Sequence, residues 1–416
     1  MAKTYDTYKD SGIAWIGEIP GEWEVKRLGN FYNQRNEKVS DKDFAPLSVT
    51  MKGIVPQLET AAKTNDGDNR KLVRKGDFAI NSRSDRRGSC GISDYDGSVS
   101  LINTVLCPKG EMDAGYYNWL FHTSMFADEY YKWGHGIVDD LWTTRWSEMK
   151  NIEVVNPPLS VQQSISSFLD TKCSEIDSLI SIQEEMISEF LAYKQSVITE
   201  AVTKGLDKKA KMKNSGVEWI GDIPEEWEVT RFKNVAKVKA NLVHPEDYLE
   251  MPQVAPDCIE KGSGKIIKYQ TVREANVISD NHLFYKGQIV YSKIRPTLNK
   301  VIIAPFDGLC CADMYPIETK ENLQFFLLQM LSSVFNEQVA VVVQDRVKMP
   351  KINKEELDQI IVICPPLPVQ QAIATYLDEK TSQIDSLIAL KQSKIESLKE
   401  YKKSIIYEYV TGKKRV

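Results

Sequence analysis

The feature that most constrains this chain is a pair of sequence motifs that each occur twice. Residues 11–27, SGIAWIGEIPGEWEVKR, return 204 residues later as SGVEWIGDIPEEWEVTR, with 12 of 17 positions identical. Residues 157–182 return 208 residues later, with 16 of 26 positions identical. The inserts between the motifs, residues 28–156 and 232–364, have nearly equal length but align almost nowhere. Because repeats mark a duplicated architecture, the chain is predicted to carry two different readers on two copies of one scaffold, which suits a two-part target.

Length and composition indicate an ordinary globular protein. The 416 residues are enough for two compact domains with connecting elements. No apolar run approaches the ~20 residues of a membrane helix, and the start, MAKTYDTYKD, lacks the apolar core of a signal peptide. The seven cysteines show no CxxC spacing, which is typical of reduced thiols. We therefore expect a cytoplasmic protein.

The charge is unevenly distributed along the chain. A formal net charge of −5 argues against a simple nucleic-acid binder. Residues 63–87, 286–300 and 341–354 are nevertheless basic, so each insert has its own positive patches. Solvated loops would explain any single patch, but their recurrence in both inserts favours phosphate binding.

Residues 160–204 and 368–411 have the periodicity of long amphipathic helices. Polar residues interrupt the apolar seam at matching places in the two copies, Gln183 with Lys391 and Lys194 with Lys402, which favours pairing between the two helices. A domain of about 130 residues is too small to carry the chain back along a helix of roughly 65 Å, so the paired helices are predicted to be antiparallel and to act as a spacer. The seam residues are Leu169, Ile176, Ile180, Ile187, Phe190, Val197, Leu377, Ile384, Ile388, Ile395, Leu398 and Ile405.

Both inserts mix short strand-like runs with turns. Residues 75–80 resemble 286–291, each a turn that leads into a strand, and residues 95–97 parallel 306–308 as a second turn. Helices are expected at 116–131 and 321–338. The predicted fold class is α+β, with two recognition domains, two long antiparallel coiled-coil helices and a pseudo-twofold internal repeat. The expected divisions are 1–156 (first recognition domain), 157–213 (central helix and linker), 214–364 (second recognition domain) and 365–416 (distal helix).

The duplicated GxxxWIGxIPxxWE entry, the PPLxxQQxI exit into a long helix and the two unlike inserts together resemble a type I restriction–modification specificity subunit. The resemblance covers essentially the whole chain. It implies that each insert is a target recognition domain, and that the target is two short DNA half-sites separated by a spacer of fixed length. It also implies two methyltransferase subunits and two restriction subunits as partners.

Within the inserts, two loops per copy resemble the DNA-binding loops of that family. They are residues 83–88 with 138–146 in the first insert, and 293–300 with 344–349 in the second, followed by Asn353, which has Trp146 at about the same place in the first copy. Arginine suits guanine, asparagine and glutamine suit adenine, and lysine mostly meets phosphate. The predicted DNA-binding residues are Arg83, Arg86, Arg87, Arg145, Lys293, Arg295, Asn299, Lys300, Gln344, Arg346, Lys348 and Lys351.

No catalytic or metal-binding motif stands out in the sequence. Residues 156–159, NPPL, lack the aromatic residue and the upstream glycine-rich loop of an adenine methyltransferase, and the four histidines have no metal spacing. We therefore expect a non-catalytic chain without a cofactor of its own. S-adenosylmethionine would belong to the methyltransferase partner, and ATP and Mg²⁺ to the restriction partner. The alternatives are a coiled-coil scaffold that never touches DNA, and a single-chain methyltransferase or nuclease.

Overall fold

A computed structural model of the chain describes residues 4–59, 67–83, 86–136, 142–346 and 348–416. Parts of the predicted loops, at 84–85, 138–141 and 347, lie outside these residues. The chain divides into two compact units. Unit 1 comprises residues 1–183 and 393–416, and unit 2 comprises residues 184–392. Each unit therefore holds one insert together with part of both long helices.

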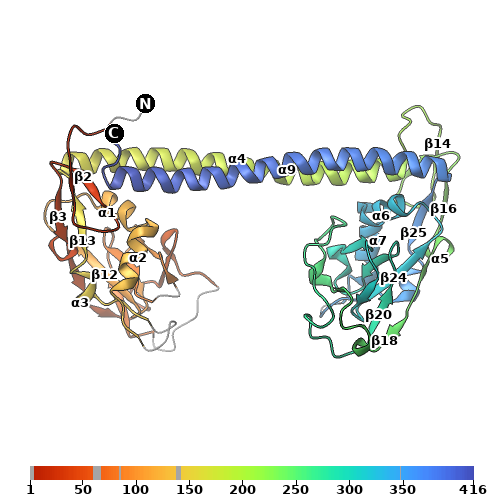
Figure 1. Ribbon diagram of the computed structural model, residues 1–416, viewed down its shortest axis with the longest axis horizontal. Coiled ribbons are helices and arrows are strands. Elements are labelled where there is room, and N and C mark those ends of the chain that lie inside the picture. Colours follow the sequence, from red (N-terminus) through yellow and green to blue (C-terminus); the bar gives the residue numbers. More distant parts are fainter. Residues whose placement is uncertain (1–3, 60–66, 84–85, 137–141, 347) are drawn as a thin grey trace. The chain divides into compact units, whose positions relative to one another are not determined.

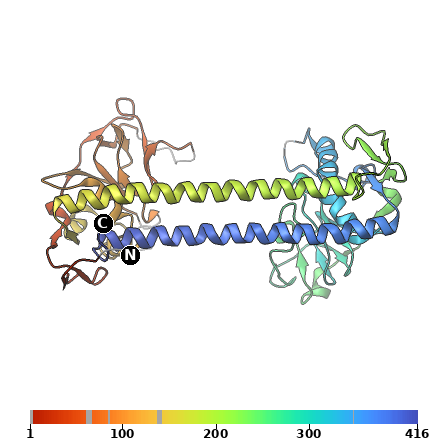
Figure 2. The same cartoon turned by 90° about the horizontal axis from the view of Figure 1, so that it is seen from above.

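The two long helices are α4 (Leu159–Lys204) and α9 (Leu367–Val410), each uninterrupted (Figure 1). In unit 1 the first half of α4 lies beside the second half of α9 (Figure 2), and the ring of Phe168 on α4 packs against that of Tyr409 on α9 at an angle of 41°, with centroids 4.5 Å apart. In unit 2 the second half of α4 lies beside the first half of α9. The helices run antiparallel in both units, as the sequence predicts.

The seam between the helices contains apolar side chains and one ion pair per unit. All twelve predicted seam residues are buried or half-buried. The ammonium of Lys402 lies 2.6 Å from the carboxylate of Asp177 in unit 1, and that of Lys194 lies 2.6 Å from Asp385 in unit 2. Each residue of one pair stands 208 positions from its counterpart in the other, so α4 and α9 exchange roles between the units.

Unit 1 is built around an antiparallel sheet in the order β10-β9-β12-β4, with helices α1 (Ala114–Phe121) and α2 (Ser124–Lys132) contributing to the same aromatic core. Phe78, Phe121 and Phe126 are fully buried in that core. A second sheet has the order β11-β8-β5. The strands of unit 1 are β1 (Tyr8–Asp10), β2 (Glu18–Pro20), β3 (Glu24–Arg27), β4 (Tyr32–Arg35), β5 (Lys38–Val39), β6 (Leu47–Thr50), β7 (Gly53–Pro56), β8 (Arg70–Val73), β9 (Phe78–Asn81), β10 (Cys90–Ile92), β11 (Gly97–Val99), β12 (Asn103–Pro108) and β13 (Glu153–Asn156), with the short helices η1 (Leu28–Asn30) and α3 (Trp146–Met149).

Unit 2 repeats this plan with different side chains. Its main sheet has the order β17-β24-β21-β22, packed against α6 (Leu323–Leu331) and α7 (Ser333–Val343), and a second sheet has the order β18-β20-β23-β19. The strands of unit 2 are β14 (Met212–Asn214), β15 (Asp222–Pro224), β16 (Glu228–Arg231), β17 (Ala236–Val238), β18 (Leu242–Val243), β19 (Gln253–Val254), β20 (Asn281–Phe284), β21 (Ile289–Ser292), β22 (Val301–Ile303), β23 (Gly308–Cys310), β24 (Met314–Thr319) and β25 (Ile361–Cys364), with the short helices α5 (Phe232–Val235), η4 (Pro245–Tyr248), η5 (Pro256–Cys258), η6 (Pro296–Leu298) and α8 (Lys354–Leu357).

The helices expected at 116–131 and 321–338 are each broken into two. The hydroxyl of Thr123 accepts a hydrogen bond from the backbone N–H of Phe126, and that of Ser332 accepts one from Phe335. Each of these hydroxyls caps the start of a second helix. The first helix therefore ends before the capping residue, which allows the chain to bend there. Among the described residues no single helix is long and apolar enough to cross a membrane; α6 and α7 reach that length and composition only when taken together across a 55° bend.

The structure explains why the first motif is duplicated. Trp23 of the first copy is fully buried against Gly412, which ends α9, and Trp227 of the second copy is buried against Gly205, which ends α4. Both glycines have φ of +75°, the left-handed conformation that closes a helix and that glycine adopts without strain. Each motif copy therefore holds the end of one long helix.

The glutamine of the second motif fixes the start of each long helix. The side-chain carbonyl of Gln162 accepts a hydrogen bond from the backbone N–H of Asp113, which caps α1, and Gln370 accepts one from Asn322, which caps α6; both distances are 2.9 Å. Gln370 is fully buried, so its loss would leave a buried N–H without a partner. The two duplicated motifs are thus scaffold elements.

Candidate nucleic-acid interface

The two predicted loops of the first insert meet in unit 1. An isolated antiparallel bridge joins Arg83, just after β9, to Thr143 of the final loop. The backbone N–H of Thr144 also donates to the carbonyl of Ser82 over 3.0 Å. Helix α3 follows directly, with Arg145 at its N-cap. Residues 60 positions apart in sequence are therefore joined at one place.

The corresponding loops of the second insert meet in the same way. A bridge joins Ile294, just after β21, to Lys351, and the N–H of Ile352 donates to the carbonyl of Lys293 over 2.9 Å. Helix α8 follows, and its N-cap is Asn353, whose side chain accepts a hydrogen bond from the N–H of Glu356. The counterpart of Asn353 in unit 1 is therefore Arg145 and not Trp146, because each is the N-cap two residues after the bridge.

An open cleft of about 650 Å³ lies beside the paired loops of unit 1. Its lining residues lie on β8, on or next to β4 and β12, in the turn after β9, and in and next to α3. Several of its side chains are cations or carry hydrogen-bonding groups, as a site for DNA requires. The amine of Lys71 donates to the carbonyl of Asn103 over 2.7 Å, and burial lowers the pKa of Lys71. The lining residues are Gln34, Lys71, Ser82, Arg83, Leu101, Ile102, Thr104, Thr143, Arg145, Trp146, Ser147 and Lys150.

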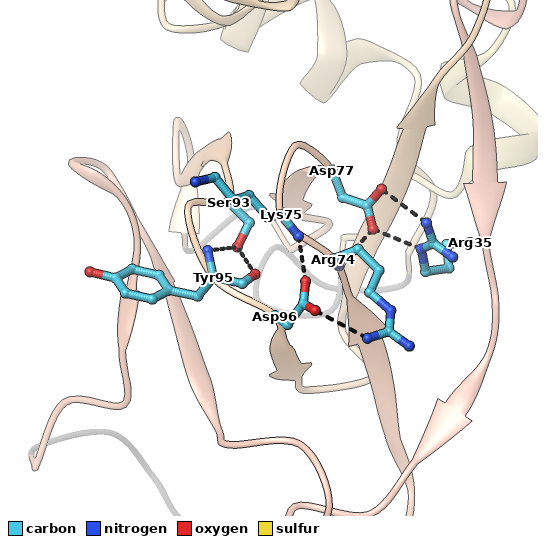
Figure 3. A network of polar contacts seen from close by, with 7 residues as sticks. All are labelled: Arg35, Arg74, Lys75, Asp77, Ser93, Tyr95 and Asp96. Atoms are coloured by element: carbon cyan, nitrogen blue, oxygen red, sulfur yellow. Dashed lines mark hydrogen bonds and ion pairs between the residues drawn. The ribbon is translucent and has the colours of Figure 1, made fainter.

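A polar network ties β4 to the turn that leads into β9 (Figure 3). The guanidinium of Arg35 on β4 contacts the carboxylate of Asp77 over 2.7 Å, and this bond raises the pKa of Arg35. Asp77 also accepts a hydrogen bond from the backbone N–H of Arg74. The carboxylate of Asp96 accepts one from the N–H of Lys75, as Asp307 does from Lys286 in unit 2. The resemblance between residues 75–80 and 286–291 therefore marks one shared turn.

Unit 2 neutralises its cations at the corresponding place. The ammonium of Lys351 lies 2.8 Å from Asp313, and that of Lys293 stands 5.1 Å over the ring of Tyr315. Arg346 forms an ion pair with Glu356, and its hydrogen bond lowers the pKa of that carboxyl. These predicted DNA-binding cations are therefore engaged within the protein.

The other predicted residues of unit 2 lie around the same loops. Arg295 and Asn299 have left-handed backbones, with φ of 45° and 46°. Asn299 is buried, and its side-chain N–H₂ donates to the carbonyl of Met330 over 3.0 Å, so its amide is used in packing. The amine of Lys300 donates to the carbonyl of Pro256 over 2.6 Å. The remaining two, Gln344 and Lys348, are exposed in the final loop.

The two remaining arginines of the first insert lie beside α2. Arg87 forms an ion pair with Asp128 and stands 5.3 Å over the ring of Tyr131. Arg86 is exposed next to it, and its N–H donates to the carbonyl of Arg83. The role of the twelve predicted residues in DNA binding stays a prediction.

Three lining residues that carry an amide or a cation, Gln34, Lys71 and Lys150, were not among the predicted DNA-binding residues. Gln34 lies on β4, where the run YNQR shows no alternation of apolar and polar residues, so no strand was expected there. Lys71 lies in the basic patch at residues 63–87. Its position on the cleft follows only from the pairing of β8 with β5 and β11. Lys150 follows α3, which was not predicted. Among the described residues there is no group of three or more His, Cys, Asp or Glu side chains that could hold a metal.

Comparisons with known proteins agree with this architecture. Residues 224–400 match the family model of the type I restriction modification DNA specificity domain. The chain is 34% identical over 258 residues to the EcoDI type I restriction enzyme specificity subunit of Escherichia coli, an alignment that spans 58% of each protein. It is 25% identical to the MjaVIII specificity subunit of Methanocaldococcus jannaschii over 96% of this chain and 94% of that one.

Two solved structures have the same fold. A chain from the type I restriction–modification system superposes with a TM-score of 0.70 at 13% identity, covering 94% of this chain and 98% of its own. The HsdS subunit of Thermoanaerobacter tengcongensis superposes with a TM-score of 0.50 at 15% identity, covering 95% and 98%. In sequence and in fold the chain is therefore similar to type I restriction–modification specificity subunits.

Proposed function

We propose that this chain is the DNA-reading subunit of a type I restriction–modification complex, and that each unit reads one half of a split target. The observation that carries the proposal is the pair of loop junctions. The same backbone arrangement occurs in both units, with Arg83 bridged to Thr143 in one and Ile294 to Lys351 in the other. A constant backbone with different side chains is what two readers of different half-sites require.

The long helices would then set the distance between the half-sites. Helix α4 has 46 residues and α9 has 44, and each contributes to both units. Half-sites about one DNA turn apart, near 34–36 Å, would present the same face of the duplex to both readers. A change in helix length is therefore expected to change the spacer of the target while leaving both half-site sequences unchanged.

Chemistry on the DNA would belong to the partner subunits. Two methyltransferase subunits would bind S-adenosylmethionine and methylate adenine, and two restriction subunits would use ATP and Mg²⁺. The net charge of −5 fits this division, since partners would supply much of the phosphate binding. A protein scaffold without DNA binding would not need two clusters of cations at matching loop junctions.

The test is methylome sequencing of cells that express the methyltransferase subunit with and without this chain. The proposal predicts a split adenine-methylated motif only when this chain is present. The same motif from the methyltransferase alone would contradict it, and so would the absence of any motif with an active partner. Binding of the purified complex to that motif should weaken as salt rises, with a slope of about −0.9 per phosphate neutralised.

A further inference from the structure

The strand ladders allow the two loop junctions to be compared position by position. Leu106 pairs with Phe78 and with Gln34 in unit 1, and Ile317 pairs with Ile289 and Val238 in unit 2. Val238 therefore occupies the place of Gln34. The same ladders and the two bridges place Ser82 with Lys293, Arg83 with Ile294, Thr104 with Tyr315, Thr143 with Lys351 and Arg145 with Asn353.

These six positions carry a different side chain in each unit, although the surrounding backbone is the same. Val238 is buried in the core of unit 2, whereas Gln34 is half-exposed and lines the cleft of unit 1. Ile294 has no polar group, whereas Arg83 is exposed on the cleft. The polar groups of Gln34 and Arg83 are therefore particular to unit 1 and are not needed by the shared scaffold.

The strand that carries Gln34 is held rigidly. The neighbouring Arg35 is bound to the buried carboxylate of Asp77, with hydrogen bonds of 2.7 and 3.2 Å (Figure 3). Because successive side chains of a strand point to opposite faces, this ion pair fixes the direction of Gln34. No side-chain hydrogen bond joins Gln34 to any other described residue, so its amide is available to a ligand in the cleft.

The guanidinium of Arg83 is placed in a comparable way. Its backbone is fixed by the bridge to Thr143 and by a hydrogen bond from its N–H to the side-chain oxygen of Asn81 over 3.0 Å. Within the described part of the chain its side chain has no acidic partner. In unit 2 the cation within the junction, Lys351, is paired with Asp313 instead.

We propose that Arg83 and Gln34 read bases of the first half-site through the major groove, Arg83 a guanine and Gln34 an adenine. The guanidinium matches the O6 and N7 acceptors of guanine, and the amide matches the N6–H donor and N7 acceptor of adenine. Lys150, an exposed cation on the same cleft, contacts a phosphate and carries no sequence information. This inference rests on the proposed function and names the base-reading groups of one of its two readers.

The test is the methylated motif of complexes that carry single substitutions in the cleft. Arg83→Lys keeps the charge but removes the bidentate hydrogen-bond donor. The preference for one guanine of the first half-site over other bases should therefore fall by about 5- to 150-fold. Gln34→Glu keeps the size but leaves only acceptors, so one adenine of the same half-site should be replaced by cytosine, whose N4–H₂ a carboxylate accepts. The second half-site should stay unchanged in both variants.

Two matched controls separate reading from folding and from affinity. Arg74→Lys makes the same change at an arginine of unit 1 that pairs with Asp96 and does not line the cleft, so it should leave both half-sites unchanged. Lys150→Ala should weaken binding equally for all sequences. If the unsubstituted complex gives no split motif, the proposed function fails. If it gives one and both half-sites persist in Arg83→Lys and in Gln34→Glu, or if the second half-site changes, this inference fails while the proposed function stands.

Discussion

Unit 1 and unit 2 are alike in their scaffold and unlike where their loops meet. In unit 1 the exposed cations of the cleft, Arg83, Arg145 and Lys150, form no ion pair with any described residue. In unit 2 Lys351 is paired with Asp313 and Arg346 with Glu356. A phosphate can therefore approach the cations of unit 1 directly, whereas it must compete with carboxylates in unit 2. Two copies of one backbone can therefore present cations that bind phosphate with different free energies.

The sharpest test of the shared scaffold uses three glycines with φ of +75°. A Cβ at Gly412 would lie 2.3 Å from Pro20, one at Gly205 would lie 3.0 Å from Trp227, and one at Gly216 would meet nothing. Alanine should lower the free energy of unfolding by about 1 kcal/mol at Gly216 for the backbone alone, and by about 2–4 kcal/mol at Gly412, where overpacking is added. Gly205 should fall between them. Chemical denaturation checks the order, and equal losses at all three would contradict the packing at the helix ends.

The ion pairs of the seam should differ in their response to pH. Burial by itself would raise the pKa of Asp385, but hydrogen bonds from Lys194 and Lys265 lower it below its ordinary value. A carboxyl with a lowered folded pKa stabilises the protein above its unfolded pKa of about 3.9, and this contribution is lost as pH falls through the folded value. Asp385→Asn should therefore cost roughly 1 kcal/mol at pH 7, and the cost should shrink only below about pH 4.

The matched variant for this test is Asp177→Asn in unit 1, where the carboxylate is 59% exposed and has one lysine partner among the described residues. Its cost should be under about 0.5 kcal/mol, since exposed pairs are screened by solvent. Urea unfolding of both variants from pH 7 to pH 3 gives the comparison. A larger cost for Asp177→Asn than for Asp385→Asn would contradict the assigned environments.

The salt dependence of DNA binding should distinguish the unpaired Lys150 of unit 1 from Lys351 of unit 2, which is paired with Asp313. Lys150→Ala in unit 1 removes a cation without an acidic partner, so the slope of log affinity against log salt should become less steep by about 0.9. Lys351→Ala in unit 2 should change the slope by less, because Asp313 already neutralises that lysine. Fluorescence anisotropy at several salt concentrations measures both, and identical slope changes would remove the distinction between the units.

The smallest expected effect comes from freeing a cation in unit 2. Asp313→Asn removes the partner of Lys351 and should raise DNA affinity about two- to fivefold, in line with the ~0.2–1 kcal/mol of an exposed ion pair. The same anisotropy measurement detects this gain. A loss of affinity with an unchanged fold would show that the Lys351–Asp313 pair positions the loop for binding.

Some of this architecture can be predicted from the sequence, because it depends on local pattern. The long helices follow from their periodicity. The observed α4 starts one residue before the predicted 160–204, and α9 both starts and ends one residue before the predicted 368–411. The shared turn at residues 75–80 and 286–291 follows from its turn residues. Such features are set by neighbours in sequence.

Other features depend on contacts between distant residues and could not be predicted. Asp313 and Lys351 are 38 positions apart, so nothing local indicates that this cation is neutralised. Gln34 reaches the cleft only because β4 pairs with β12, a long-range ladder. The breaks at Thr123 and Ser332 were missed because the apolar pattern continues through each capping residue. The predicted domain divisions stay predictions, since the compact units each combine an insert with part of both long helices.

The central claim is that the two inserts are separate readers on one scaffold. The most direct measurement is the methylated motif of a chain in which residues 28–156 are replaced by residues 232–364, expressed with the methyltransferase subunit. This chain is expected to give a motif whose two halves are the same and match the original second half-site. Survival of the original first half-site, or a change in both halves, would contradict it.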